Sequence, residues 1–208
     1  MYSGVLQDIC QNSGRIDGKM CVKTTEGRCT VCIHVMFICY ENICRSPMAE
    51  GIFASLLRRH GLLEYFEVSS AGTVAYQEGS TPDERAIASA VRFGVDISSF
   101  RASGLDGDDL QLCDWIFVMD HENHRDVSRL LRPEHADKLY LVMDFVDGCA
   151  GQEITDPYYG SADGFDRVAR DLFMASEQIL LRMFDYYPDL ALQAEPFETF
   201  QRQERSGD

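Results

Sequence analysis

Two residues six positions apart, Cys39 and Arg45, can together carry out chemistry on a phosphate group. An apolar, β-prone run at residues 31–38 leads to the cysteine, and Ser46 and Pro47 follow the arginine. Because serine before proline is a helix-start signal, the sequence predicts a strand ending at Cys39, a tight loop, and a helix with Pro47 at its first position. The free N–H groups of such a loop and the helix dipole favour a bound phosphate dianion.

Cys39 is the candidate nucleophile at this site. The positive field that holds a phosphate also stabilises a thiolate, which is the reactive form of cysteine. Arg45 can donate two parallel hydrogen bonds to phosphate oxygens, and the hydroxyl of Ser46 can donate to the sulfur. The chemistry indicated is attack by Cys39 on phosphorus, which forms a phosphocysteine intermediate. A buried cysteine that ends an ordinary strand, with Arg45 on the surface, is the alternative that the residue types leave open.

The rest of the chain alternates predicted strands with predicted helices. Further strands are expected at residues 66–70, 114–119 and 138–143, and helices at residues 48–60, 82–93, 121–131 and 163–187. This alternation predicts an α/β fold with a parallel sheet and helices on both faces. Ligands of such sheets bind at the carboxyl ends of strands, where Cys39 is expected.

The segment CYENICRSPMAEG, which begins at Cys39, resembles the phosphate loop of the low-molecular-weight protein tyrosine phosphatases, C-x-G-N-I-C-R-S-P. Four more stretches fit that family in the same order: SSAGT at residues 69–73, PDERA at 82–86, MDHEN at 119–123 and DPYYG at 156–160. The resemblance implies a flavodoxin-like fold with four parallel strands in the order 2-1-3-4. It also implies a protein tyrosine phosphatase that needs no metal and no cofactor. The residues that would bind phosphate are Tyr40, Glu41, Asn42, Ile43, Cys44, Arg45 and Ser46.

Asp156 matches the general acid of the family. Its residue types alone predict a surface turn, because Asp-Pro and Gly160 favour turns. Cleavage of a tyrosine phosphate expels a phenol oxygen that must be protonated as the bond breaks. A carboxylic acid can supply this proton and then activate water against the phosphocysteine. The resemblance therefore adds Asp156 to Cys39 and Arg45 as the third catalytic residue.

The resemblance also implies supporting roles near the loop. Asn42 and Ser70 match a pair that braces the phosphate loop through side-chain hydrogen bonds, and Ser46 supports the nucleophile. Asp120 matches the residue that aims the loop arginine at phosphate. Its position also fits a helix N-cap, and it could have both roles.

Three tyrosines and a second cysteine complete the predicted site. Tyr76, Tyr158 and Tyr159 match aromatic residues of the substrate crevice, where stacking on a phenol contributes roughly 0.5–1.5 kcal/mol per ring pair. Half-burial under a loop is the alternative for Tyr159. In the family, the counterpart of Cys44 forms a reversible disulfide with the nucleophile under peroxide, which makes the enzyme redox-sensitive. A small buried residue is the alternative for Cys44.

Glu41 departs from the family pattern, which has glycine there. If the loop needs a positive φ at this position, glutamate costs on the order of 1–2 kcal/mol. A carboxylate facing the phosphate would oppose it by about 2–4 kcal/mol at an effective dielectric of about 20. Because the loop N–H groups point inward, we expect the side chain to point outward, where water and salt screen its charge. The departure leaves a weakly active phosphate-binding relative as an alternative.

Two related activities are further alternatives. Arsenate reductases of this fold share a similar C-x5-R loop but need additional thiols and lack the DPYYG acid, so Asp156 disfavours that activity. Protein arginine phosphatases carry threonine where this chain has Ile43, which favours phosphotyrosine as the substrate. Bacterial relatives often oppose tyrosine kinases, so a tyrosine kinase is a candidate partner beside the phosphotyrosine protein itself.

Length and composition bound the remaining possibilities. The 208 residues predict one phosphatase domain at residues 31–187, a mobile N-terminal extension at 1–30, and an acidic, loose C-terminal tail at 188–208. A net charge of −15 argues against a nucleic-acid partner. The sequence contains neither an apolar run of about 20 residues nor a secretory signal pattern, so we expect no membrane association.

The eight cysteines form no compact framework, which predicts a reducing, cytoplasmic setting. Cys29 and Cys32 make one CxxC pair, with Cys21 and His34 nearby. A zinc site needs four ligands, and the predicted first strand commits Cys32 and His34 to packing. Incidental cysteines are therefore favoured over a metal site.

Overall fold

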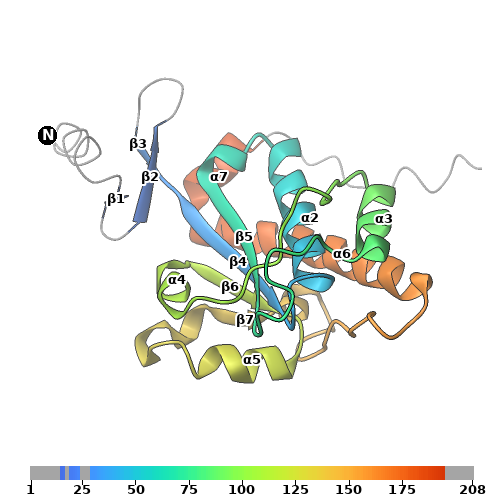
Figure 1. Ribbon diagram of the computed structural model, residues 1–208. Helices are drawn as coiled ribbons and strands as arrows, with labels where there is room; N and C mark the ends of the chain where they lie inside the picture. Colours follow the sequence, from blue (N-terminus) through green and yellow to red (C-terminus); the bar gives the residue numbers. More distant parts are fainter. Residues whose placement is uncertain (1–14, 17–18, 24–28, 195–208) are drawn as a thin grey trace, which may run out of the picture.

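The computed structural model describes residues 15–16, 19–23 and 29–194 of the 208-residue chain, without the side chains of 15–31 and of Asp189. Its central sheet contains four parallel strands: β4 (Ile33–Cys39), β5 (Phe66–Gly72), β6 (Trp115–Val118) and β7 (Leu139–Leu141). Their spatial order is β5-β4-β6-β7. When the four strands are numbered by their order in the chain, their order across the sheet is 2-1-3-4, which confirms the flavodoxin-like prediction (Figure 1).

Strand β4 lies at the centre of the sheet because its sequence, IHVMFIC, is almost continuously apolar. It pairs with β5 from Ile33 opposite Phe66 to Cys39 opposite Gly72, and with β6 on its other side. Cys39 is the last residue of the strand. The candidate nucleophile therefore lies at the carboxyl end of the central strand, as predicted.

Helices cover both faces of the sheet (Figure 1). One face packs against α2 (Arg45–Arg59) and α6 (Ala162–Tyr186), and α3 (Glu84–Arg92) packs on these two helices. In α6, Phe165, Leu172 and Ile179 recur every seven residues and are all buried in this core. The other face packs against α4 (Gly107–Leu112) and α5 (His121–Ser128), which contribute Leu110 and Val127 to a second core.

Short 3-10 helices lie in the connections at Leu63–Tyr65, Pro133–Lys138 and Val142–Phe145. The last of these begins at Val142 and so replaces the final two residues of the strand predicted at residues 138–143. Helix α4 was not predicted, since six residues are too few to show a helical period; the side chain of Asp106 caps its first turn.

Both flanking segments contain elements that the sequence reasoning did not foresee. Strands β1 (Arg15–Ile16), β2 (Lys19–Lys23) and β3 (Cys29–Val31) form a separate antiparallel sheet within the predicted N-terminal extension. Helix α7 (Pro188–Gln193) begins the predicted tail and places Leu190 in the main core. The predictions for residues 1–14, 17–18, 24–28 and 195–208 lie outside the described residues. Among the helices of the described part, none combines the length and apolar character needed to cross a bilayer.

Candidate active site

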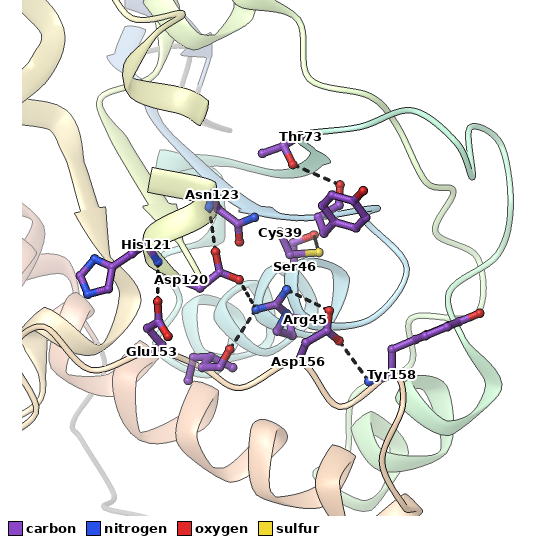
Figure 2. A network of polar contacts seen from close by, with 12 residues as sticks. Cys39, Arg45, Ser46, Thr73, Asp120, His121, Asn123, Glu153, Asp156 and Tyr158 are labelled. Atoms are coloured by element: carbon purple, nitrogen blue, oxygen red, sulfur yellow. Dashed lines mark hydrogen bonds and ion pairs between the residues drawn. The ribbon is translucent and has the colours of Figure 1, made fainter. Parts of the chain in front are cut away.

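The loop between Cys39 and α2 differs from the sequence prediction at the helix start. Helix α2 begins at Arg45 with Cys44 as its N-cap residue, two positions before the predicted start at Pro47. Proline is tolerated there because the first four N–H groups of a helix have no intrahelical acceptor. Ser46 does not cap the helix. Its hydroxyl lies 3.0 Å from Sγ of Cys39, so this serine contacts the candidate nucleophile (Figure 2).

Asn42 braces the loop as the resemblance implied. Its Nδ2 donates to Oγ of Ser46 and Oγ of Ser70, each over 2.8 Å. Its Oδ1 accepts a hydrogen bond from the backbone N–H of Ser103. Asn42 is buried and has a φ of 58°, a left-handed conformation that asparagine tolerates. These hydrogen bonds hold the strained residue that curls the loop.

Glu41 carries no backbone strain of this kind. Among the described residues other than glycine, only Asn42 has a positive φ. The backbone-strain cost considered for Glu41 is therefore absent. Glu41 is half-buried and lines the pocket above Cys39, together with Glu122 of α5.

Glu50 extends the bracing network away from the nucleophile. Oγ of Ser70 donates to its Oε2 over 2.6 Å, so hydrogen bonds run without a break from Glu50 through Ser70, Asn42 and Ser46 to Cys39. Burial raises the pKa of Glu50, and the hydrogen bond from Ser70 only partly opposes that shift. The sequence reasoning had no signal for this residue, because a glutamate on a helix is usually solvated.

Arg45 is 2% exposed, and its guanidinium has three partners. Nη1 donates to Oδ2 of Asp120 over 2.7 Å and to the carbonyl of Ile154, while Nη2 donates to Oδ2 of Asp156 over 3.2 Å (Figure 2). Burial disfavours the charge, but Cys39, Asp156 and Asp120 outweigh it and raise the pKa of Arg45. The arginine is thus a fixed cation beside the sulfur.

Asp120 makes a contact that corresponds to each of the two roles considered for it. Its Oδ1 accepts from the backbone N–H of Asn123 and caps α5, while its Oδ2 holds Arg45. One carboxylate therefore fixes the arginine relative to the carboxyl end of β6.

A pocket of about 370 Å³ opens over these residues. It brings together the end of β4, the start of α5 and the loop that precedes α6. The residues that line it are 39–41, 43–45, Asp120, Glu122, Asn123, Asp156, Tyr158 and Tyr159. Cys39, Arg45 and Asp156, predicted from distant parts of the sequence, all line this one pocket.

Asp156 belongs to residues 146–161, the segment between the 3-10 helix at Val142–Phe145 and α6. Its Oδ1 accepts from the backbone N–H of Tyr158 over 3.0 Å, and its other oxygen faces Arg45. The predicted turn is present, since the N–H of Gly160 donates to the carbonyl of Pro157. The turn and the proposed acid are therefore the same feature.

The aromatic residues are distributed differently from the prediction. Tyr158 and Tyr159 line the pocket and meet edge to face, with ring centroids 5.1 Å apart. Tyr159 is 95% exposed, so the half-buried alternative does not describe it. Tyr76 is 77% exposed and is not among the lining residues. Tyr40 of the phosphate loop is among the lining residues.

Two other cysteines bear on the sequence predictions. Cys44 is buried within the loop between Cys39 and Arg45, and its pKa is raised, mainly by burial and then by Asp83. Cys32 of the CxxC pair is buried, and burial, Glu67 and Asp114 raise its pKa to about 11. The side chains of Cys21 and Cys29 lie outside the described residues.

The sequence reasoning missed several residues of the site. Glu122 and Asn123 line the pocket. Both belong to the MDHEN stretch, for which the resemblance implies a role of Asp120 only. The PDERA stretch contains Asp83, whose N–H donates to the carbonyl of Ile43, and Arg85, which donates to the carbonyls of Tyr158 and Gly160 in the acid loop (residues 156–160, named after the proposed acid Asp156). Their motif was recognised, but nothing in it indicated what they touch.

Comparison with known proteins identifies one family. The family model described as low molecular weight phosphotyrosine protein phosphatase matches residues 34–187. A low molecular weight phosphotyrosine protein phosphatase of Schizosaccharomyces pombe is 35% identical over 134 residues, which cover 64% of this chain and 85% of that protein. The low molecular weight protein-tyrosine phosphatase A of Mycobacterium bovis is 38% identical over 137 residues, which cover 65% of this chain and 82% of that protein.

A solved structure leads to the same family. The crystal structure of a protein tyrosine phosphatase from Entamoeba histolytica matches with a TM-score of 0.71 at 30% identity, and covers 74% of this chain and 99% of that one. The sheet order, the C-x5-R loop and the aspartate beside its arginine lie within the matched region. This chain belongs to the low molecular weight protein tyrosine phosphatase family of hydrolases.

Proposed function

We propose that this protein hydrolyses phosphotyrosine in proteins, and small aryl phosphates, through a phosphocysteine intermediate. The observation that carries the proposal is that Cys39, Arg45 and Asp156 line one pocket, with Ser46 3.0 Å from the sulfur. Nucleophile, cation and acid are thus available to one bound phosphate. Family membership supports the same chemistry.

In the first step, Sγ of Cys39 attacks phosphorus, a sulfur–phosphorus bond forms, and the bond to the phenol oxygen breaks. Asp156 gives its proton to that oxygen, so a neutral phenol leaves. Arg45 and the N–H groups of residues 40–46 hold the phosphate oxygens, with support from Asn42 and Ser70.

In the second step, Asp156, now a carboxylate, takes a proton from water. The water oxygen bonds to phosphorus and the sulfur–phosphorus bond breaks, which releases phosphate and restores the thiolate of Cys39. The hydroxyl of Ser46 stabilises the departing thiolate by a hydrogen bond. No step is assigned to a metal or a cofactor.

The pocket rim supports phosphotyrosine as the substrate. Tyr40, Tyr158 and Tyr159 offer apolar ring faces to a flat phenol. Ile43, in place of the threonine of arginine phosphatases, favours the same substrate class. We further propose a cytoplasmic location, since Cys32, Cys39, Cys44, Cys113 and Cys149 are all free thiols. An opposing tyrosine kinase is the proposed functional partner, and the net charge of −15 argues against nucleic acid.

The test is turnover of a phosphotyrosine peptide and of p-nitrophenyl phosphate, each with and without EDTA, beside phosphoserine peptide and phosphoarginine. We expect hydrolysis of the first two, unaffected by EDTA, and none by Cys39→Ser. Turnover of phosphoarginine alone would contradict the proposed substrate class. Reduction of arsenate in the presence of thiols, without hydrolysis of any ester, would support the arsenate reductase alternative.

A further inference from the structure

Arg85, in the first turn of α3, contacts the segment that follows Asp156. Its Nη1 donates to the carbonyl of Tyr158 over 3.1 Å and to the carbonyl of Gly160 over 3.4 Å. Both acceptors lie just after Asp156 in the chain. Arg85 lies outside the residues that line the pocket, so it does not touch the phosphate site itself.

The segment before Asp156 is held by other elements. The N–H of Ile154 donates to the carbonyl of Met119 over 2.8 Å, and Arg45 donates to the carbonyl of Ile154. Oε1 of Glu153 accepts from the N–H of His121 over 2.8 Å. This side of the acid is therefore tied to the end of β6 and the start of α5.

The segment after Asp156 has a different support. Within the described residues, the hydrogen bonds that tie residues 157–160 to another element are those from Arg85; the bond from the N–H of Gly160 to Pro157 is local. Arg45 also holds Asp156, but the proposed reaction needs that guanidinium for phosphate. An anchor that does not involve the phosphate site is then required to keep the acid in place.

Arg85 is itself rigidly held, which such an anchor requires. Its Nε and Nη2 make a two-pronged contact with Asp83, at 3.0 Å and 2.8 Å. Its guanidinium lies 4.5 Å from the ring centroid of Phe165, a fully buried residue in the first turn of α6. An arginine with all three nitrogens and one face occupied has little rotamer freedom.

Asp83 extends the connection to the nucleophile loop. Its backbone N–H donates to the carbonyl of Ile43 over 2.8 Å, and its carboxylate caps α3 through the N–H of Arg85. Two residues, Asp83 and Arg85, thus connect residue 43 to residue 158 by hydrogen bonds. These two residues therefore hold the acid loop at a fixed position relative to the phosphate loop.

We propose that Arg85 is a positioning residue for the general acid: it fixes residues 157–160 against the phosphate loop so that Asp156 stays aligned with the leaving oxygen. This inference rests on the proposed function. It predicts that loss of Arg85 harms the reaction most where protonation of the leaving group matters most.

The test compares Arg85→Gln with Arg92→Gln, a matched control. Arg92 lies on the same helix and pairs with Asp166 of α6, and not with residues 157–160. The quantity measured is kcat/KM for aryl phosphates whose leaving phenols span a wide range of pKa. For Arg85→Gln we expect a loss about tenfold larger for phenyl phosphate than for a dinitrophenyl phosphate, and for Arg92→Gln a uniform change below about threefold. A uniform loss in Arg85→Gln would mean a structural role only and would overturn the inference.

Two more variants sharpen the result. In the Asp156→Asn background, Arg85→Gln should cost less than about threefold for any substrate, because the group that it positions is gone. Arg85→Lys keeps the charge and a donor but loses the fork, so its leaving-group dependence should lie between wild type and Arg85→Gln. Full additivity with Asp156→Asn would also contradict the inference.

A readout that needs no activity separates this inference from the proposed function. Amide hydrogen exchange of a peptide spanning residues 156–161 should be about tenfold faster in Arg85→Gln than in wild type, and unchanged in Arg92→Gln. If wild type hydrolyses no aryl phosphate, the proposed function fails while exchange still decides whether Arg85 holds the loop. Equal exchange in all three proteins would overturn the inference even in an active enzyme.

Discussion

Nη2 of Arg45 donates a hydrogen bond over 3.2 Å to Oδ2 of Asp156, so the arginine proposed to bind phosphate also contacts the proposed acid. The same guanidinium holds Asp120 through Nη1 over 2.7 Å. The two contacts differ in exposure, because the side chain of Asp120 is 19% exposed and that of Asp156 is 46% exposed. We therefore expect Asp120 to keep its contact with Arg45 when phosphate binds, and Asp156 to give up its own.

This relationship gives Asp156→Asn two separable effects. Turnover should fall in proportion to the pKa of the leaving phenol, because esters of acidic phenols need little protonation. Vanadate should bind about two- to fivefold more tightly, since a partly exposed carboxylate no longer competes for Arg45. Steady-state kinetics on a series of phenyl phosphates and a vanadate titration measure the two effects. A loss that is equal across the series would remove Asp156 from the role of acid.

Cys39→Ser should abolish turnover and preserve phosphate or vanadate binding. The loop N–H groups and Arg45 are proposed to bind phosphate, and Asn42 braces the loop through Ser46 and Ser70. None of these contacts requires the sulfur, whereas the covalent step does. Kinetics and isothermal titration with vanadate test the two halves. Residual activity within about tenfold of wild type would show that another group is the nucleophile.

Glu41→Gly should raise kcat/KM by less than about tenfold, which is under about 1.4 kcal/mol. No backbone strain is relieved, because only Asn42 among the described non-glycine residues has a positive φ. What remains is the charge at the pocket, and Glu41→Gln removes it while keeping the side-chain length. We therefore expect the two variants to behave alike. An inactive wild type that Glu41→Gly restores by several orders of magnitude would instead identify a phosphate-binding relative.

Mild peroxide should inactivate the enzyme reversibly through a disulfide between Cys39 and Cys44. The raised pKa of Cys44, caused first by its burial, keeps it a thiol, so oxidation should begin at Cys39. Peptide mass spectrometry without reductant would locate the bond. In Cys44→Ser, recovery with thiol should be poorer, because Cys39 is left open to deeper oxidation. Equal recovery in that variant would point to a different partner.

Glu50→Gln should change stability in a pH-dependent way. Burial raises the pKa of Glu50, so its contribution to folding is greatest below its unfolded pKa of about 4.3 and declines as the pH rises through the folded value. Glutamine has no such ionisation. The Tm of the variant relative to wild type should therefore increase between about pH 4 and pH 7. Thermal unfolding across this range measures the trend. A difference in Tm that does not change with pH would show that folding leaves the pKa of Glu50 unshifted.

The sequence determined the parts of the site that are local. Cys39 ends an apolar strand, and the five residues to Arg45 form a loop that leads into a helix, so the placement of these two residues was predictable from spacing. The N-cap at Asp120 was equally local. The motif resemblance added the strand order and the identity of Asp156. Even here the helix start was misplaced by two residues, because Ser46 bonds to Cys39 and Asn42 instead of capping.

Only the tertiary structure decided how distant segments meet. The hydrogen bond from Ser70 to Glu50 depends on packing α2 against β5, and the contacts of Arg85 depend on α3 lying beside the acid loop. The exposure of Tyr76 and the use of Tyr40 at the pocket likewise depend on how loops from separate strands come together. Sequence patterns record the burial and turn preferences of each element, whereas these contacts arise from distances between elements that only the folded sheet sets.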